Sequence, residues 1–212
     1  MHHPGPAQRH HSQRCAHKPR AKSRVEHAQH FISPPTCTDY HHPLPEDIIS
    51  ANFLAFSADK MQSLHGDIAT CLGKLTEEQI WQRGGPHENS VGNLLMHLEG
   101  NIRQWILHGI DNQPDVRRRD DEFTLAPSIH SSAAFANLTA TINESRQIIT
   151  ALPPARLTEV IDPQPNGTWR HTTILVAIYK VVSHLEYHVG QIVLLTKQLH
   201  GTDLDLSMPR KR

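Results

Sequence analysis

Apolar residues recur at steps of three and four positions in four separate segments of the chain. The segments span about residues 46–74, 90–108, 131–152 and 172–200. These steps place apolar side chains on one face of an α-helix, so the pattern predicts four long amphipathic helices. No segment shows the sustained alternation of apolar and polar residues that is typical of a strand. The chain is therefore predicted to be all-α, with the helices packed as a four-helix bundle.

Residues near the segment ends support these helix boundaries. Thr76 and Gln79 have the spacing of a capping box at the start of a short extra turn of helix, and Thr172 or Thr173 suits the N-cap of the last helix. Gly109 is expected to end the second helix in a left-handed conformation. The connections after the second and third helices are longer than a simple bundle needs, and long connections in compact domains often have a function.

The first 44 residues differ from the rest of the chain in composition. They are rich in His, Pro and Arg, and the stretch MHHPGPAQRHHSQRCAHKPRAKSR contains almost no large apolar side chain. Such a segment cannot bury enough apolar surface to offset the entropy lost on ordering, so residues 1–44 are predicted to be a disordered tail. The expected organisation is this tail, a bundle over residues 45–205, and a short basic tail over residues 206–212.

Charge, cysteine content and hydropathy narrow the functional classes. The formal net charge is zero, which gives no indication of a nucleic-acid partner. The three cysteines have no C-x-x-C spacing, so neither a disulfide framework nor a thiolate zinc site is expected. The chain has neither a signal-peptide core nor an uninterrupted apolar run of about 18 residues, so no membrane span is expected and a cytoplasmic location fits best.

Two histidines stand out in the apolar stretch VVSHLEYHVGQIVLL. His184 and His188 lie one helical turn apart in the fourth predicted helix. Their Cβ atoms are expected to be about 5–6 Å apart, which lets both imidazoles bind one metal ion. An H-x-x-x-H pair alone is also compatible with two core histidines that have hydrogen-bond partners.

A third histidine strengthens the case for a metal site. His97 lies between apolar residues in the middle of the second helix, and Asn93, His97 and Asn101 follow one another at steps of four. This polar stripe and the stripe with the two later histidines should face each other, because either one buried alone would contain unsatisfied groups. The pattern predicts an open metal site formed by His97, His184 and His188, with a position left for water or substrate.

Other polar residues are candidates for binding a substrate beside these histidines. Gln191 faces nearly the same way as His188. The charged run RRRDDEF either folds over the site or is a solvated loop, and its spacing alone favours the solvated loop. Lys180, one turn before His184, either belongs to the site or extends to solvent at the end of the bundle. The candidate substrate-binding residues are Asn93, Asn101, Arg118, Asp120, Glu122 and Gln191.

Three blocks of the sequence resemble a known family. ENSVGNLLMHLEGNIRQWILHGI, RRRDDEF and VSHLEYHVGQIVLLTKQLHG are similar to the corresponding blocks of the DinB-like (YfiT-like) four-helix-bundle proteins, closest to a bacterial subgroup of cytosolic members. The resemblance covers about residues 45–201. It implies a zinc, nickel or other divalent ion held by His97, His184 and His188, and frequent homodimers. It also implies either a thiol S-transferase that uses a low-molecular-weight thiol or a metal-dependent hydrolase.

The leading hypothesis is a divalent-metal-binding protein that acts as an enzyme on a small molecule. The ion would lower the pKa of a bound water or thiol and so produce a nucleophile near neutral pH. Hydrolysis and thiol transfer remain alternatives at this stage. Two other classes also remain: a non-catalytic metal-binding or stress-associated interaction protein, and an interaction module whose histidines are only polar core groups. No nucleic-acid or membrane partner is expected.

Overall fold

The computed structural model describes residues 47–124, 129–164, 167 and 170–206 of the chain. The predicted tail over residues 1–44 lies outside the described residues, as do residues 207–212 of the predicted C-terminal tail. The proposed domain boundaries and the disorder of the N-terminal tail therefore stay predictions.

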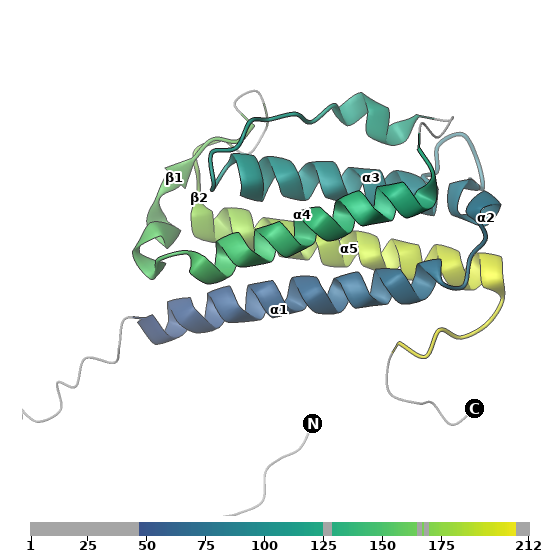
Figure 1. Cartoon of the computed structure of the whole chain (residues 1–212), viewed down its shortest axis with the longest axis horizontal. Helices are drawn as coiled ribbons and strands as arrows, with labels where there is room; N and C mark the ends of the chain where they lie inside the picture. The colour runs from purple at the N-terminus through teal and green to yellow at the C-terminus, as the bar shows by residue number, and fades with distance from the viewer. Residues whose placement is uncertain (1–46, 125–128, 165–166, 168–169, 207–212) are drawn as a thin grey trace, which may run out of the picture. The chain divides into compact units, whose positions relative to one another are not determined.

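The described part of the chain is an all-α bundle of four long helices, as the apolar periodicity predicted (Figure 1). The helices are α1 (Asp47–Leu72), α3 (Val91–Ile102), α4 (Ser131–Ala151) and α5 (Ile174–His200). Both α1 and α3 pack against α4 and against α5, so α1 lies diagonally across the bundle from α3. The short helix α2 (Glu77–Trp81) begins with the predicted capping box of Thr76 and Gln79.

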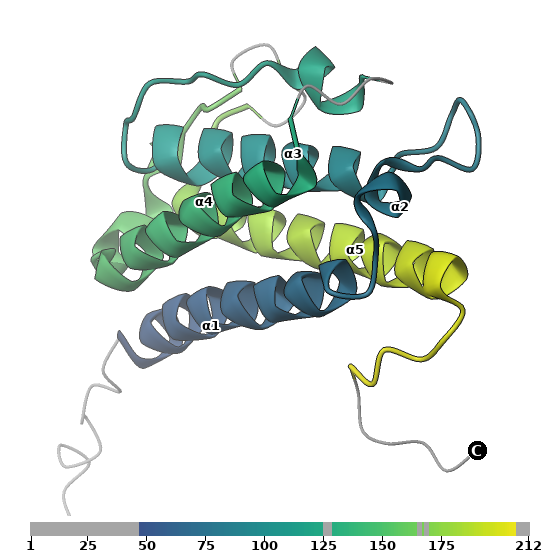
Figure 2. The same cartoon turned by 45° about the vertical axis from the view of Figure 1, so that its right-hand side comes forward.

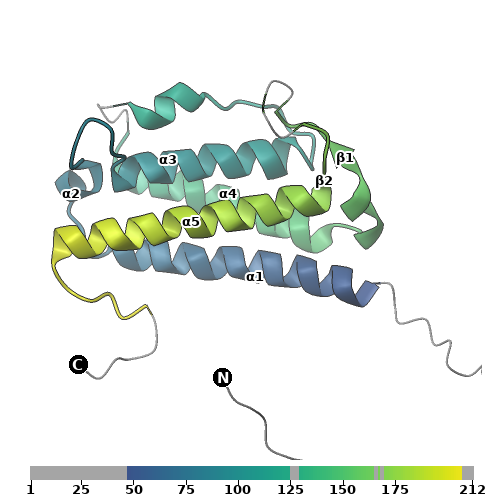
Figure 3. The ribbon, with the colours of Figure 1, turned by 180° about the vertical axis from the view of Figure 1, so that it is seen from behind.

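The direction of the helices explains why the connection after the second long helix is long. In Figures 1 and 3, α3 and α4 run in the same direction, opposite to α1 and α5. The chain must therefore return along the length of α3 before α4 can begin. Residues 111–124, which we call the crossover loop, make this return over the outer side of α3, and they contain the 3-10 turn η3 (Arg119–Phe123) (Figure 2).

The second long helix changes its winding before it ends. Residues Arg103–His108 form a π-helical segment, η2, directly after α3. The expectation that Gly109 is left-handed was wrong, because its φ is −71°. A Cβ at Gly109 would lie 2.6 Å from the carbonyl oxygen of Trp105 and 2.9 Å from Cβ of Pro163. Close packing against the later connection is therefore the reason for a glycine here.

The connection between α4 and α5 contains a strand pair that the sequence did not predict. After the 3-10 turn η4 (Pro154–Thr158), strands β1 (Val160–Ile161) and β2 (Thr172–Thr173) pair antiparallel. Each strand has two residues, too few for an alternating pattern to be visible in the sequence. Thr173 then caps α5 by accepting a hydrogen bond from the backbone N–H of Val176.

A continuous apolar core fills the bundle, with Trp105 among its fully buried side chains. Polar contacts also cross this packing between α1 and α4, including those of Arg146 with Ala58 and Gln62. His65 lies flat against the ring of Phe135, with ring centroids 5.0 Å apart, and its Nε2 donates a hydrogen bond of 2.8 Å to the hydroxyl of Thr139. Among the described residues, no helix is long and apolar enough to cross a lipid bilayer.

Candidate metal site

Three imidazoles from two antiparallel helices converge in the bundle. His97 projects from α3, and His184 and His188 project from successive turns of α5. Nε2 of His184 lies 3.2 Å from Nε2 of His97 and 3.1 Å from Nε2 of His188. The two polar stripes therefore face each other as the sequence predicted, and the three nitrogen atoms are close enough to share one ion.

The outer nitrogen atoms of two of these imidazoles have acceptors that fix their protonation. Nδ1 of His97 donates to the carboxylate of Glu122 at 2.8 Å, and Nδ1 of His188 donates to the side-chain oxygen of Gln191 at 2.7 Å. A neutral imidazole carries one proton, so Nε2 of each presents a lone pair toward His184. Metal-binding histidines usually have this arrangement, in which an acceptor holds the other ring nitrogen.

The third imidazole cannot satisfy both neighbours by hydrogen bonding. A proton on Nε2 of His184 can be donated to one of the two lone pairs, which leaves the other without a donor. Nδ1 of His184 is buried and has no hydrogen-bond partner in the described part of the chain. A proton there would instead leave three lone pairs facing one another. A cation bound by all three Nε2 atoms removes this conflict, so the donor set fits a metal ion.

The spacing of the nitrogen atoms also fits. With bonds of about 2.0–2.1 Å, two ligand nitrogens are about 2.9 Å apart at a right angle and about 3.3 Å apart at a tetrahedral angle. The observed separations of 3.1 and 3.2 Å lie between these values. Three neutral ligands leave at least one further position of the ion for water or another ligand.

The crossover loop provides a buried carboxylate behind His97. Glu122 is 4% exposed, and Arg117 makes a two-pronged ion pair with it, from Nε to Oε1 at 2.7 Å and from Nη2 to Oε2 at 2.9 Å. Nη1 of Arg117 also donates to Gln104 at 3.0 Å. A buried ion pair is tolerated when its remaining polar atoms have partners, and here His97 and Gln104 supply them. His97 is thus held by a carboxylate that keeps its negative charge.

A second set of contacts fixes the end of the crossover loop. The side-chain nitrogen of Asn93 donates to the backbone carbonyls of Glu122 and Thr124, at 3.0 and 3.2 Å. Arg83 donates to Asn93 and to the carbonyls of Phe123 and Thr124. Because Asn93 also caps the start of α3 together with Ser90, the loop end is tied to the helix that carries His97.

Burial and neighbouring charged groups shift the pKa values of the site. Burial is the largest cause that lowers the pKa of His184, to about 3, and His188, His97, Arg117 and Lys180 add to it. Burial also lowers the pKa of His188, although its bond to Gln191 acts in the opposite direction. These imidazoles are therefore neutral near pH 7, which is the form that binds metal.

The pKa of the Glu122 carboxylate is also lowered, but its partners are the cause and burial opposes them. Burial alone would raise the pKa of Glu122, but its hydrogen bonds to Arg117 and His97, together with their charges, outweigh burial and lower the pKa. Glu122 is therefore ionised near neutral pH and remains an acceptor for Nδ1 of His97.

Comparison with known protein families matches residues 48–212 to a family described as proteins of unknown function, DUF1572. The chain belongs to the DUF1572 family. The matched region includes all three site histidines and the whole crossover loop. Comparison with curated proteins found no match.

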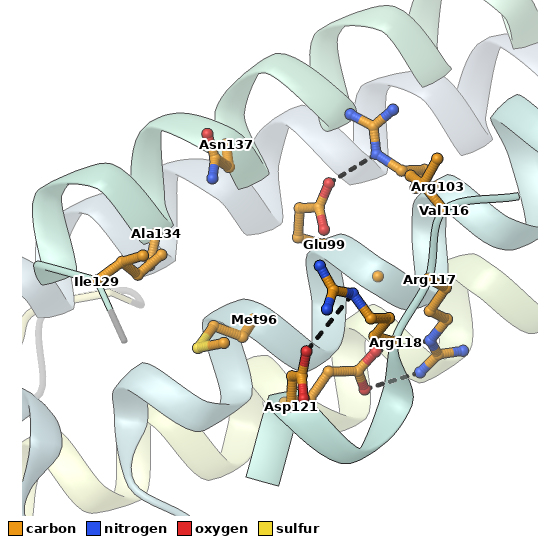
Figure 4. Close-up of a pocket in the computed structure, with 12 residues that line it drawn as sticks. Met96, Glu99, Arg103, Val116, Arg117, Arg118, Asp121, Ile129, Ala134 and Asn137 are labelled. Carbon is orange, nitrogen blue, oxygen red and sulfur yellow. Dashed lines mark hydrogen bonds and ion pairs between the residues drawn. The ribbon is translucent and has the colours of Figure 1, made fainter. Parts of the chain in front are cut away.

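The DUF1572 protein has a cavity of about 210 Å³ beside the Arg117–Glu122 pair (Figure 4). Its apolar wall includes Met96, Ile129 and Ala134, and further ion pairs border it. None of the three histidines lines this cavity. It therefore borders the carboxylate that holds His97 and does not enclose the convergence point of the imidazoles.

The structure places the other predicted residues of the DUF1572 protein in different positions. Gln191 contacts His188, and Asn101 is 9% exposed one turn after His97 on α3. Asn93 and Glu122 are buried between α3 and the crossover loop. Arg118 and Asp120 are exposed, and no described contact brings either of them to an imidazole. A substrate-binding role for any of these residues stays a prediction.

Sequence reasoning missed three residues that build the surroundings of the site. Arg117 pairs with Glu122, Arg83 holds the loop end, and the ring of Phe123 lies 5.1 Å from that of His97. The sequence did contain one signal of these surroundings, Gly100, because a glycine inside an apolar helix often marks a place where another segment approaches the helix closely. A Cβ at this position would lie 2.4 Å from Oε1 of Glu122.

Proposed function

We propose that this protein is a DinB-like divalent-metal-binding protein and that His97, His184 and His188 hold the ion. The observation that carries the proposal is the convergence of three Nε2 atoms while the outer nitrogens of His97 and His188 donate to Glu122 and Gln191. These two hydrogen bonds direct the Nε2 lone pairs of His97 and His188 toward one point, which is the arrangement that metal-binding histidines usually have.

The proposed activity is metal-dependent catalysis on a small molecule, either thiol transfer or hydrolysis. An ion at such a site acts as a Lewis acid and lowers the pKa of a water or thiol in its open position. The protein itself keeps His184 and His188 neutral by burial, holds His97 in one orientation through Glu122, and covers one side of the site with the crossover loop. A low-molecular-weight thiol as second reactant and a homodimer in the cytoplasm are parts of the same proposal.

A non-catalytic metal-binding protein is the second candidate. It is favoured by the position of the 210 Å³ cavity, which borders Glu122 and is not lined by any of the three histidines. A metal site that this cavity does not enclose fits a structural role better than catalysis. The two candidates share the ion and differ in whether a substrate reaches it.

The first test is the metal content of the full-length protein. Nine of the 18 histidines precede residue 45, so loosely bound ions must first be removed with a weak competing chelator. About one tightly bound divalent ion per chain is expected, and it should be absent from His97→Ala and from His184→Ala. His200→Ala, at an exposed position on the end of α5, is the matched control and should keep the ion.

If the parent binds no ion under loading conditions, the proposal fails as a whole. If the ion is bound, the loaded protein is incubated with low-molecular-weight thiols and a panel of electrophiles and esters. Thiol consumption coupled to electrophile loss supports transfer, and ester cleavage without thiol supports hydrolysis. Absence of both, with the ion in place, favours the non-catalytic candidate.

A further inference from the structure

A second polar feature continues the site along the contact between α3 and α5. Figures 1 and 3 show the two helices side by side and in opposite directions. His97, Asn101 and Trp105 follow one another at steps of four on α3 and η2, and His188, His184 and Lys180 do so in reverse order on α5. The row thus passes from the metal site to Lys180 within about one helical turn.

Lys180 on α5 contacts a residue of the facing helix. Its Nζ lies 4.7 Å from the centre of the Trp105 ring, a cation–π contact that holds the ammonium between the two helices. Trp105 reaches this place from the π-helical segment η2, and π-helical turns occur frequently at functional sites. The cation is therefore held at the end of the row by a contact with the facing helix.

Asn101 lies between the imidazoles and this cation. The residue is 9% exposed, and its amide makes no hydrogen bond to another residue in the described ranges 47–124, 129–164 and 170–206. A buried side-chain amide is most stable when an acceptor receives hydrogen bonds from its N–H groups. A ligand that extends from the open position of the ion toward Lys180 would pass this amide.

The charges of the site indicate the sign of the charge on its ligand. A divalent ion held by three neutral imidazoles keeps its full charge, because Glu122 contacts His97 only at the outer nitrogen and is already paired with Arg117. Lys180 adds a further positive charge one turn from His184. Concentrated positive charge at a partly buried position favours a ligand with negative charge.

We propose that Asn101 and Lys180 form an anion subsite beside the three-histidine site and that it binds the carboxylate of a small acidic ligand. The proposal rests on the metal-binding function proposed above and names the substrate class of that site. Lys180 supplies the charge, the Asn101 amide donates a hydrogen bond, and the other end of the ligand lies at the open position of the ion. Both groups act as specificity-determining residues.

The test compares two probes that differ in one charge, 3-mercaptopropionate and its neutral amide. They are titrated into the full-length protein loaded with Co²⁺, and binding is followed by the thiolate-to-cobalt absorption band. The acid should bind about tenfold more tightly than the amide in the parent protein, as expected for one charge-assisted contact. Lys180→Gln and Asn101→Ala should reduce this preference, and Lys180→Arg should keep most of it.

Lys74→Gln is the matched control, because it also removes one lysine charge. Lys74 is exposed and follows the end of α1, whereas Lys180 lies near the start of α5, which runs in the same direction. It should leave the preference for the acid unchanged. Equal binding of acid and amide in the parent, or an unchanged preference in Lys180→Gln, would overturn the anion subsite. Circular dichroism melts of each variant ensure that a lost preference does not reflect unfolding.

A second measurement does not depend on the ion and separates failure of the two proposals. In the ion-free protein, the indole N–H signal of Trp105 is followed by NMR during titration with propionate and with propionamide. Saturable shifts with propionate alone, lost in Lys180→Gln, support the subsite even if no metal binds. No shift with propionate would overturn it, whereas failure of Co²⁺ to bind would overturn only the metal site.

Discussion

Glu122 carries a negative charge although only 4% of the residue is exposed. It is stable there because Arg117 donates two hydrogen bonds to it and His97 donates a third. Removing one partner of such a buried group costs about 3–5 kcal/mol, so the three residues must be treated as a unit. These three residues couple the position of the His97 imidazole to the position of the crossover loop.

Substitution of Glu122 should weaken metal binding as well as the fold. Glu122→Gln keeps an oxygen that accepts from His97 but loses the charge, and metal affinity is expected to fall by about 10- to 100-fold. Asp120→Asn is the control on the same loop, since Asp120 is exposed, and its affinity should match the parent. Competition with a chromogenic chelator measures both. Equal affinities would show that the carboxylate does not hold the imidazole in place.

Gly100 tests the same unit by sterics alone. A Cβ at this position would lie 2.4 Å from Oε1 of Glu122 and 3.2 Å from Nε of Arg117. Gly100→Ala should therefore displace the carboxylate and lower the free energy of unfolding by about 1–3 kcal/mol. Gly66→Ala, with nothing within 4 Å of the added Cβ, should raise it by about 0.5–1 kcal/mol. Urea denaturation distinguishes the two, and stabilisation by both would contradict the predicted clash.

The sequence predicted the three histidines but not all of the residues that support them. His97, His184 and His188 lie in helices, where a step of four fixes which side chains share a face. Arg117 lies in a loop beside two other arginines, and a loop has no period that would select one of them. The pairing of Glu122 with His97 joins two segments 25 positions apart. Only the return path of the chain over α3 determines that contact.

At the scale of elements, the crossover loop is held to the start of α3 by Asn93. Asn93→Ala removes both donors to the loop carbonyls and part of the capping box, so the free energy of unfolding should fall by about 2–3 kcal/mol. Hydrogen–deuterium exchange should also become faster in residues 119–124 than in α4. Asn143→Ala, at an exposed position of α4, should change neither quantity, and a uniform increase in exchange across the bundle would contradict a local role.

The long helices were predictable and their irregular ends were not. Periodicity located α1, α3, α4 and α5 because each buries a continuous apolar stripe. The π-helical segment η2 follows α3 without a break in the apolar pattern, so no change of winding could be read there. Gly109 has the residue type of a left-handed helix end, but its φ of −71° continues the helical winding, and the space for a Cβ is taken by Trp105 and Pro163.

At the scale of the whole bundle, the ion-free protein should lose stability in acid. The folded-state pKa of His184 is lowered to about 3 from 6.5, chiefly by burial. Between these pH values the unfolded chain binds more protons, so the contribution of His184 is fully present above pH 6.5 and is lost as the pH falls toward 3. The lowered pKa of Glu122 adds a further loss below its ordinary value of 4.5.

Urea denaturation at several values between pH 7.5 and pH 4.5 measures this loss. His184→Gln removes the titrating group, so its free energy of unfolding should depend less steeply on pH than that of the parent. The difference between the two proteins should shrink as the pH falls. Parallel pH profiles would show that the buried imidazole does not contribute.

The crossover loop also has a consequence for kinetics. His97 and the two later histidines lie on different helices, and the loop covers the outer side of one of them and is tied down by Asn93 and Arg83. If the three histidines hold an ion, its release on the side of His97 requires this imidazole to turn away, and the hydrogen bond to Glu122 opposes that turn. The residence time of the ion should therefore follow the opening rate of a surface loop, so that a protein of modest affinity would still exchange its metal slowly.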